Sequence, residues 1–385
     1  MKSRQLTLLA ALTGLFVAAA FVAVISRQTA NQAPFARQAF FPGLDQQIES
    51  VSQVKVETGQ GNVLVMRDAK GGWILPERGG WPANFDVVRK AILALAKLEA
   101  IEKRTALAQN HGVLLLAAPD DKNAAHKDKG VRITLFDAAQ KPLASLILGK
   151  VQSPPSGTRA GIAYARRDGE AQVFLAQGDV NIPLLTSDWI DRALFDIAEP
   201  RIASVRIVPP SGTEYDIQRA DPGAGFAITK MLKGKELVLP ELPGNIARAI
   251  ALLPLDDAMP ADRIDFSQAF RADYRLFDGL LLTSWTVMHD GARWTRFEAS
   301  FDPAQAEAAA KAGLLEKHPK LLKPDAVEKQ IAEINARTKG WAFMLPGMKS
   351  SDLMRDYYDL FKTPDPVKKP EDESGVQADP EFGRP

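Results

Sequence analysis

The sequence predicts an α+β protein: an N-terminal transmembrane helix followed by two related lobes of antiparallel sheet packed with helices. Three observations predict this architecture. An uncharged apolar run lies close to the N-terminus, segments that alternate between apolar and polar residues recur along the chain, and two groups of these segments each lead into apolar residues at helical spacing. The expected parts are a cytoplasmic tip and transmembrane anchor at residues 1–27, a stalk at 28–42, a first lobe at 43–200, a second lobe at 201–362 and a disordered tail at 363–385.

The uncharged run, residues 6–25, reads LTLLAALTGLFVAAAFVAVI. As a helix, its 20 residues would span about 30 Å, which is the thickness of the hydrocarbon core of a bilayer. Lys2 and Arg4 precede it, and positive residues favour the cytoplasmic side. We therefore expect a single-pass protein of the bacterial inner membrane whose bulk lies in the periplasm. A signal peptide cut after Ser26 stays open as the alternative, although its apolar region is usually shorter.

Composition excludes several classes of function. The chain has 385 residues and no cysteine, which rules out disulfides, thiolate zinc sites, iron–sulfur clusters and cysteine nucleophiles. Charge is balanced, with 48 Lys and Arg against 47 Asp and Glu, and no long basic stretch occurs. Nucleic acid is therefore not an expected partner, because nucleic-acid binding needs a basic surface.

The first lobe is expected to begin with three short strands. Residues 51–57 alternate as a half-buried strand should, and turns separate them from strands at 63–65 and 73–75. A helix is expected over residues 85–98, with Asn84 as its N-cap.

The same order of elements recurs later in the chain. The expected copies are strands at 203–208, 215–217 and 226–228 and a helix at 246–253. The tripeptide Leu-Phe-Asp also lies in an alternating strand of each copy, at 135–137 and 276–278. The period is too long for a solenoid, so the repeat predicts a degenerate duplication into two lobes.

Further strands complete each lobe, and the C-terminal part becomes helical. The additional strands are expected at 144–148, 163–166, 173–176, 280–288 and 294–300. The expected C-terminal elements are a helix starting at Asp302-Pro303, a second helix ending at Gly340, a strand at 341–345 and a final amphipathic helix at 353–361.

A search for catalytic motifs finds no phosphate-binding loop, metalloprotease motif or nucleophile elbow in the sequence. The histidines lie scattered beside turn or loop residues, at positions 111, 126, 289 and 318, without the spacing of metal ligands. Ser52 and Lys55 match the pattern S-x-x-K, but they fall on a strand, where positions three apart point to opposite faces. We therefore predict no catalytic, cofactor-binding or metal-binding residues, and no cofactor.

Two weaker signals keep other functions open. Acidic residues in loops could supply the paired carboxylates of a cell-envelope hydrolase, although most such residues are simply solvated. They are Asp120, Asp121, Asp256, Asp257, Asp262 and Asp265. Two tryptophan pairs, Trp73 with Trp81 and Trp285 with Trp294, could stack on sugar rings as in an envelope glycan-binding module, although packing in the core is the commoner role.

Several short segments, in the same order along the chain, resemble the bacterial family called domain of unknown function 4340. They are residues 41–44 (FPGL), 73–76 (WILP), 80–85 (GWPANF), 188–192 (DWIDR), 294–300 (WTRFEAS) and 340–343 (GWAF). The resemblance covers residues 40–362.

The resemblance implies a membrane-anchored, extracytoplasmic α+β protein associated with an ABC-type transport system of the gliding-motility auxiliary kind. Its implied partners are the inner membrane, through residues 6–25, and the permease or auxiliary subunits of the transporter. No catalytic residues are established for the family, so the resemblance assigns none. We therefore expect a non-enzymatic accessory or scaffold protein, with the hydrolase and the glycan-binding module as alternatives.

Overall fold

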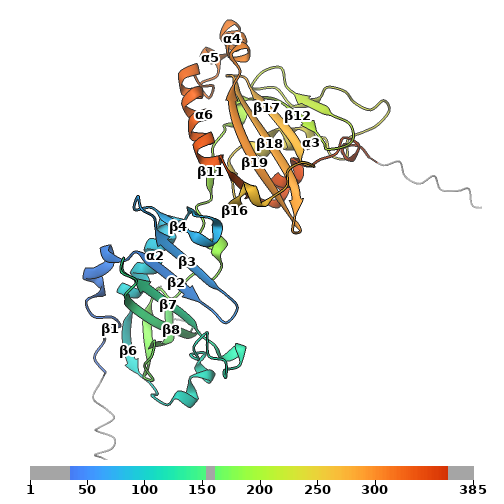
Figure 1. Cartoon of the computed structure of the whole chain (residues 1–385). Helices are drawn as coiled ribbons and strands as arrows, with labels where there is room; N and C mark the ends of the chain where they lie inside the picture. The colour runs from blue at the N-terminus through green and yellow to red at the C-terminus, as the bar shows by residue number, and fades with distance from the viewer. Residues whose placement is uncertain (1–34, 153–160, 363–385) are drawn as a thin grey trace, which may run out of the picture. The chain divides into compact units, whose positions relative to one another are not determined.

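A computed structural model describes residues 35–152 and 161–362, which divide into two compact units (Figure 1). The first unit ends at Asp191 and the second begins at Arg192, earlier than the expected boundary at residue 200. The reason is that the next segment pairs inside the second unit: β11 (Ala193–Phe195) is hydrogen-bonded to β15 (Leu253–Pro254).

Unit 1 is built on one antiparallel sheet of ten strands in the order β1-β6-β10-β9-β8-β7-β2-β3-β4-β5. Its strands are β1 (Gln38–Ala39), β2 (Gln53–Glu57), β3 (Asn62–Arg67), β4 (Trp73–Leu75), β5 (Trp81–Pro82), β6 (Glu99–Lys103), β7 (Val131–Phe136), β8 (Pro142–Gln152), β9 (Gly161–Arg167) and β10 (Val173–Gly178). In β2, Val54 and Val56 are buried while Lys55 and Glu57 are half-buried, so the predicted alternation is confirmed.

The helix of unit 1, α2 (Phe85–Ala96), begins where the sequence predicts. The side chain of Asn84 accepts hydrogen bonds from the backbone N–H groups of Asp86 and Val87, as an N-cap does. The apolar face of α2 packs on the sheet, where Leu95 and the β7 residue Ile133 line the same small internal space.

The predicted stalk is wrong at its C-terminal end. β1 pairs with β6, and Phe40 is fully buried, with the guanidinium of Arg167 above its ring. The free energy gained by burying the Phe40 side chain favours packing of this segment on the sheet, although polar residues lie close to it in sequence.

Unit 2 contains an eight-stranded antiparallel sheet in the order β14-β13-β12-β17-β18-β19-β20-β16. Its strands are β12 (Ile202–Val208), β13 (Tyr215–Gln218), β14 (Ala227–Ile228), β16 (Asp257–Pro260), β17 (Phe270–Leu276), β18 (Leu280–His289), β19 (Ala292–Phe301) and β20 (Trp341–Met344). Its helices are α3 (Leu242–Ala247), α4 (Pro303–Lys311), α5 (Leu314–Lys317), α6 (Pro324–Thr338) and α7 (Gly347–Asp352).

The strand order is the same in the two units. Eight strands of unit 1 follow β4-β3-β2-β7-β8-β9-β10-β6, and those of unit 2 follow β14-β13-β12-β17-β18-β19-β20-β16. In chain order, a helix lies between the third and fourth of these eight strands in each unit: α2 lies between β4 and β6, and α3 between β14 and β16. The main difference is the connection after β9 and β19, which is a short turn in unit 1 and the helices α4, α5 and α6 in unit 2 (Figure 1).

The C-terminal elements agree with prediction up to β20, and then differ. Asp302 caps α4 by accepting a hydrogen bond from Gln305 N, and Pro303 is its first residue. The final helix predicted at 353–361 is absent: α7 lies before it, and the apolar side chains of this stretch are held by tertiary contacts. Tyr357 Oη donates to the carbonyl of Lys230, and Phe361 forms a bridge with Leu237.

No helix in residues 35–152 and 161–362 combines the length and apolar character needed to cross a bilayer. The run predicted as the anchor, residues 6–25, and the predicted tail, residues 363–385, lie outside the described residues.

Candidate functional site

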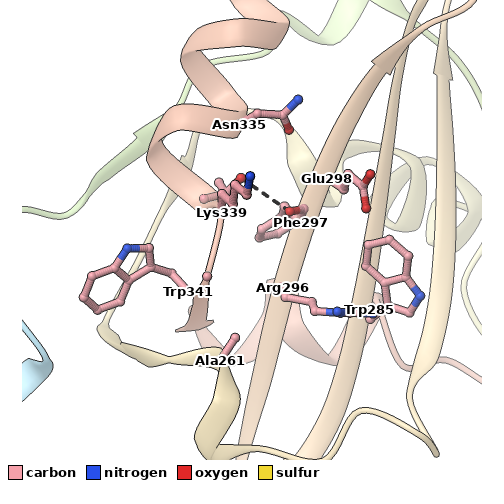
Figure 2. A pocket seen from close by; sticks show the side chains of 10 residues that line it. Ala261, Trp285, Arg296, Phe297, Glu298, Asn335, Lys339 and Trp341 are labelled. Carbon is pink, nitrogen blue, oxygen red and sulfur yellow. Dashed lines mark hydrogen bonds between the residues drawn. The ribbon is translucent and has the colours of Figure 1, made fainter.

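The candidate site is a hollow of about 430 Å³ beside the C-terminal end of α6, called here the α6 hollow. It is lined by Ala261, Trp285, Arg296, Phe297, Glu298, Asn335, Thr338, Lys339, Gly340 and Trp341. Its volume lies in the usual range for small-molecule sites. Figure 2 shows Trp285 and Trp341 on opposite sides, with Arg296 between them.

The sheet and the end of a helix bring these side chains together. Trp285 on β18 and Arg296 on β19 are cross-strand partners, so their side chains stand on the same face. α6 ends at Thr338, whose Oγ1 donates to the carbonyl of Ile334 at 2.9 Å and lies 3.4 Å from the carbonyl of Phe297. Gly340 follows with φ 82°, a left-handed conformation that glycine adopts without strain, and turns the chain into β20.

Arg296 is the most clearly prepared group in the hollow. Its guanidinium carbon lies 4.4 Å from the ring centre of Trp285 and 5.3 Å from that of Phe266. The side chain is exposed, and within the described residues no carboxylate oxygen lies within ion-pairing distance of it. The rings restrict the guanidinium without using its N–H groups, which stay available to an oxyanion.

The other polar groups have distinct roles. Lys339 and Glu298 are exposed at the rim and have no ion pair among the described residues. Asn335 is engaged instead: its side-chain amide donates to the carbonyl of Ala299 at 2.8 Å and accepts from its N–H at 2.9 Å. The hollow is therefore lined by one stacked cation, one exposed cation, one carboxylate and two indole rings.

The acidic loop residues fall into two groups, one in each unit. Asp120 and Asp121 belong to unit 1, whereas the four other candidates belong to unit 2. Asp120 is bound to Arg132, 2.7 Å away, and this hydrogen bond lowers the pKa of its carboxyl group. Asp121 accepts a turn hydrogen bond from Asn123 N.

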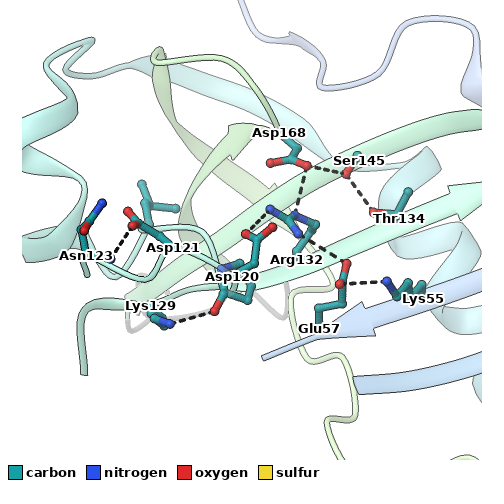
Figure 3. A network of polar contacts seen from close by, with 12 residues as sticks. Lys55, Glu57, Asp120, Asp121, Asn123, Lys129, Arg132, Thr134, Ser145 and Asp168 are labelled. Carbon is teal, nitrogen blue, oxygen red and sulfur yellow. Dashed lines mark hydrogen bonds and ion pairs between the residues drawn. The ribbon is translucent and has the colours of Figure 1, made fainter. Parts of the chain in front are cut away.

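Arg132 is the centre of this network (Figure 3). Besides Asp120, it lies 3.0 Å from Asp168 and 3.6 Å from Glu57, which in turn pairs with Lys55. Arg132 is thus shared by three carboxylates, one of which also has Lys55, and the Arg132–Asp120 contact attaches the 118–129 loop to the sheet.

In unit 2, Asp256 pairs with Arg192 at 3.4 Å, and Asp265 accepts hydrogen bonds from Ser267. Asp257 lies in β16 and Asp262 in a short 3₁₀ turn. These contacts are those of loops and strand ends, and no described group of three or more His, Asp or Glu residues has the geometry of a metal site.

Ser52, Lys55 and two of the histidines each have their own separate partners. Lys55 binds Glu57 at 2.9 Å, whereas Ser52 Oγ donates to the carbonyl of Phe136. A ring nitrogen of His111 lies 3.0 Å from the carbonyl of Ala171, and His289 lies 3.4 Å from Asp290.

Of the four tryptophans predicted as platforms, three are buried. Trp73, Trp81 and Trp294 are 6%, 1% and 5% exposed, whereas Trp285 is half-buried and lines the hollow. The predicted pairing of Trp285 with Trp294 is wrong, because the indole across the hollow from Trp285 is that of Trp341. The sequence does not distinguish the two faces of β18, because Trp285 shares its face with Leu281, Thr283 and Val287 while Ser284 and Thr286 lie on the other.

A family model described as a domain of unknown function (DUF4340) matches residues 73–276, more than half of the 385-residue chain. No curated protein matches the chain. No solved structure matches it either.

Proposed function

Because this chain belongs to the DUF4340 family, we propose that it is a membrane-anchored, extracytoplasmic accessory or scaffold protein of an ABC-type transport system, of the gliding-motility auxiliary kind. The main support is the chemistry of the α6 hollow. An arginine stacked on aromatic rings, beside further exposed charged groups, suits reversible binding, whereas the candidate acids of the described residues are held in loop and network contacts.

The proposed anchor is the apolar run at residues 6–25, with Lys2 and Arg4 on the cytoplasmic side. The two units would then stand in the periplasm and contact the transporter. The absence of cysteine suits an exported protein that depends on packing for its stability.

We also infer that the two units arose from one ancestral unit. The eight-strand order is shared, and so is the position of a helix between the third and fourth of these strands, which supports a common origin. Leu-Phe-Asp falls at the end of β7 and of β17, which are equivalent strands.

Anchoring can be tested by carbonate extraction of membranes from cells that produce the full chain. We expect the protein to stay in the membrane pellet. Replacing Leu15 and Val17 with Arg should release it, because each arginine at the centre of a spanning helix costs about 2.5–3.5 kcal/mol. The control is Leu15→Ala with Val17→Ala, which should stay in the pellet. Release of the unaltered protein by carbonate would contradict the anchor.

Association can be tested by purifying the full chain from membranes in mild detergent after cross-linking in cells. We expect the permease and the ATP-binding subunit of one transporter to co-purify in fixed proportion. The double-arginine variant should lose both. If the anchored protein elutes without any transporter subunit, the proposed function is wrong.

A further inference from the structure

We propose that the α6 hollow binds an anionic saccharide, whose carboxylate or phosphate is received by Arg296. This inference does not depend on the proposed transporter partner. It follows from the stacked guanidinium, the indole rings and a second hollow that continues the first.

Arg296 has the features of an oxyanion receptor. Its guanidinium lies between Trp285 and Phe266, and no described carboxylate pairs with it. An arginine oriented in this way loses little conformational freedom on binding, and its fork of N–H groups matches a carboxylate or phosphate in two parallel hydrogen bonds. Lys339 at the rim adds a second positive charge on a flexible stem.

The aromatic rings indicate a saccharide as the body of the ligand. Trp341 is half-buried and stands across the hollow from Trp285 (Figure 2). An indole ring offers a broad apolar face to the C–H groups of a sugar, while its surroundings remain wet. Glu298 can accept hydrogen bonds from hydroxyl groups, which a purely anionic ligand without hydroxyls would not offer.

A second hollow, of about 340 Å³, extends the site along the same face of the sheet. It shares Trp285 and Glu298 with the first and adds groups from β17 and β18, including Asp273 and Thr283. Thr283 Oγ1 donates to Asp273 at 3.0 Å. The polar strip is therefore longer than one hollow, which suits a chain of linked sugars.

The hollow lies in unit 2, where β20 (Trp341–Met344) is shorter than its counterpart β10 (Val173–Gly178). β20 pairs with β19 only at Trp294 and Thr295, whereas β10 pairs with β9 along its whole length. α6 lies against the remainder of β19, and the hollow opens where the helix ends and the strand begins.

The test is titration calorimetry on the full chain in detergent with four probes. Tri-galacturonate carries carboxylates, glucose 6-phosphate carries a phosphate, cellotriose is neutral, and inorganic phosphate lacks a sugar. We expect one or both anionic sugars to bind more tightly than cellotriose and inorganic phosphate. Binding of only one of the two anionic sugars identifies the source of the oxyanion.

Variants locate the binding. Arg296→Gln should weaken binding at least about tenfold, since a charge-assisted contact is lost, and Trp341→Ala should weaken it for both anionic sugars. Arg296→Lys keeps the charge but not the paired hydrogen bonds, so it should bind with intermediate affinity. The matched control is Arg206→Gln, because Arg206 lies on the same sheet but pairs with Asp216.

Thermal unfolding of each variant shows whether it is folded. The proposal is overturned if neither anionic sugar binds, if cellotriose or inorganic phosphate binds as tightly as they do, or if folded Arg296→Gln binds like the unaltered protein.

Discussion

At the scale of single residues, the Leu-Phe-Asp tripeptides at 135–137 and 276–278 end in aspartates with different roles. Asp137 organises a turn and accepts backbone hydrogen bonds from Ala139 and Lys141, both at 2.9 Å. Asp278 is buried and contacts Arg201 at 2.6 Å, also accepting a hydrogen bond from Leu322 N. The sequence predicts the shared strand but not this difference, because the partners Arg201 and Leu322 come from distant segments.

Asp278→Asn should destabilise unit 2 by about 3 kcal/mol, because Arg201 would keep a buried charge without a counter-ion. The measurement is urea unfolding followed by circular dichroism. Asp137→Asn is the matched control and should cost about 1 kcal/mol or less, since asparagine also forms such turns. Equal effects of the two substitutions would show that the buried pair contributes no more than the turn.

At the scale of elements, α6 completes the edge of β19 that β20 leaves uncovered. Asn335 supplies one donor and one acceptor to the backbone of Ala299, as a neighbouring strand would. The periodicity of α6 is readable from the sequence, but its docking on β19 is not, because the contacts of Asn335 and Thr338 are made with residues 36 and 41 positions earlier in the chain. The helix predicted at 353–361 is absent for a similar reason. Its residues make tertiary contacts instead, such as the hydrogen bond from Tyr357 Oη to the carbonyl of Lys230.

Asn335→Ala should destabilise unit 2 by about 1–3 kcal/mol and speed amide hydrogen exchange at Ala299, because both backbone groups lose their partner. Hydrogen-exchange mass spectrometry of the 296–301 segment measures this effect. Glu328→Ala, an exposed position on the same helix, is the control. Unchanged exchange at Ala299 would mean that packing alone holds α6 in place.

At the scale of the whole molecule, the alternating strands, α2 with its N-cap and the antiparallel architecture are all predictable from local pattern. The α6 hollow is not, because Trp285, Arg296 and Trp341 come together only through sheet register and the inserted helices. The burial of Phe40 is likewise a tertiary effect that its polar neighbours conceal.

Each unit has its own core, so residues 35–191 and 192–362 produced separately should each unfold cooperatively in urea. A cut between Asp191 and Arg192 spares the hydrogen bonds on both sides, from Asp191 N to Pro82 O and from Leu255 N to Arg192 O. Circular dichroism and dispersed amide signals in NMR spectra provide the measurement. A fragment that stays unfolded alone would contradict the independence of that unit.

The amide of Asn335 has one more consequence. An uncovered strand edge is a template on which another polypeptide can add itself, and from there sheets grow into aggregates. The backbone N–H and C=O groups of Ala299 are both bonded to the side chain of Asn335, so a strand from another molecule cannot pair with β19 at that position. Part of β19 can thus remain without a second neighbouring strand, which leaves room for a ligand and does not expose an edge that promotes aggregation.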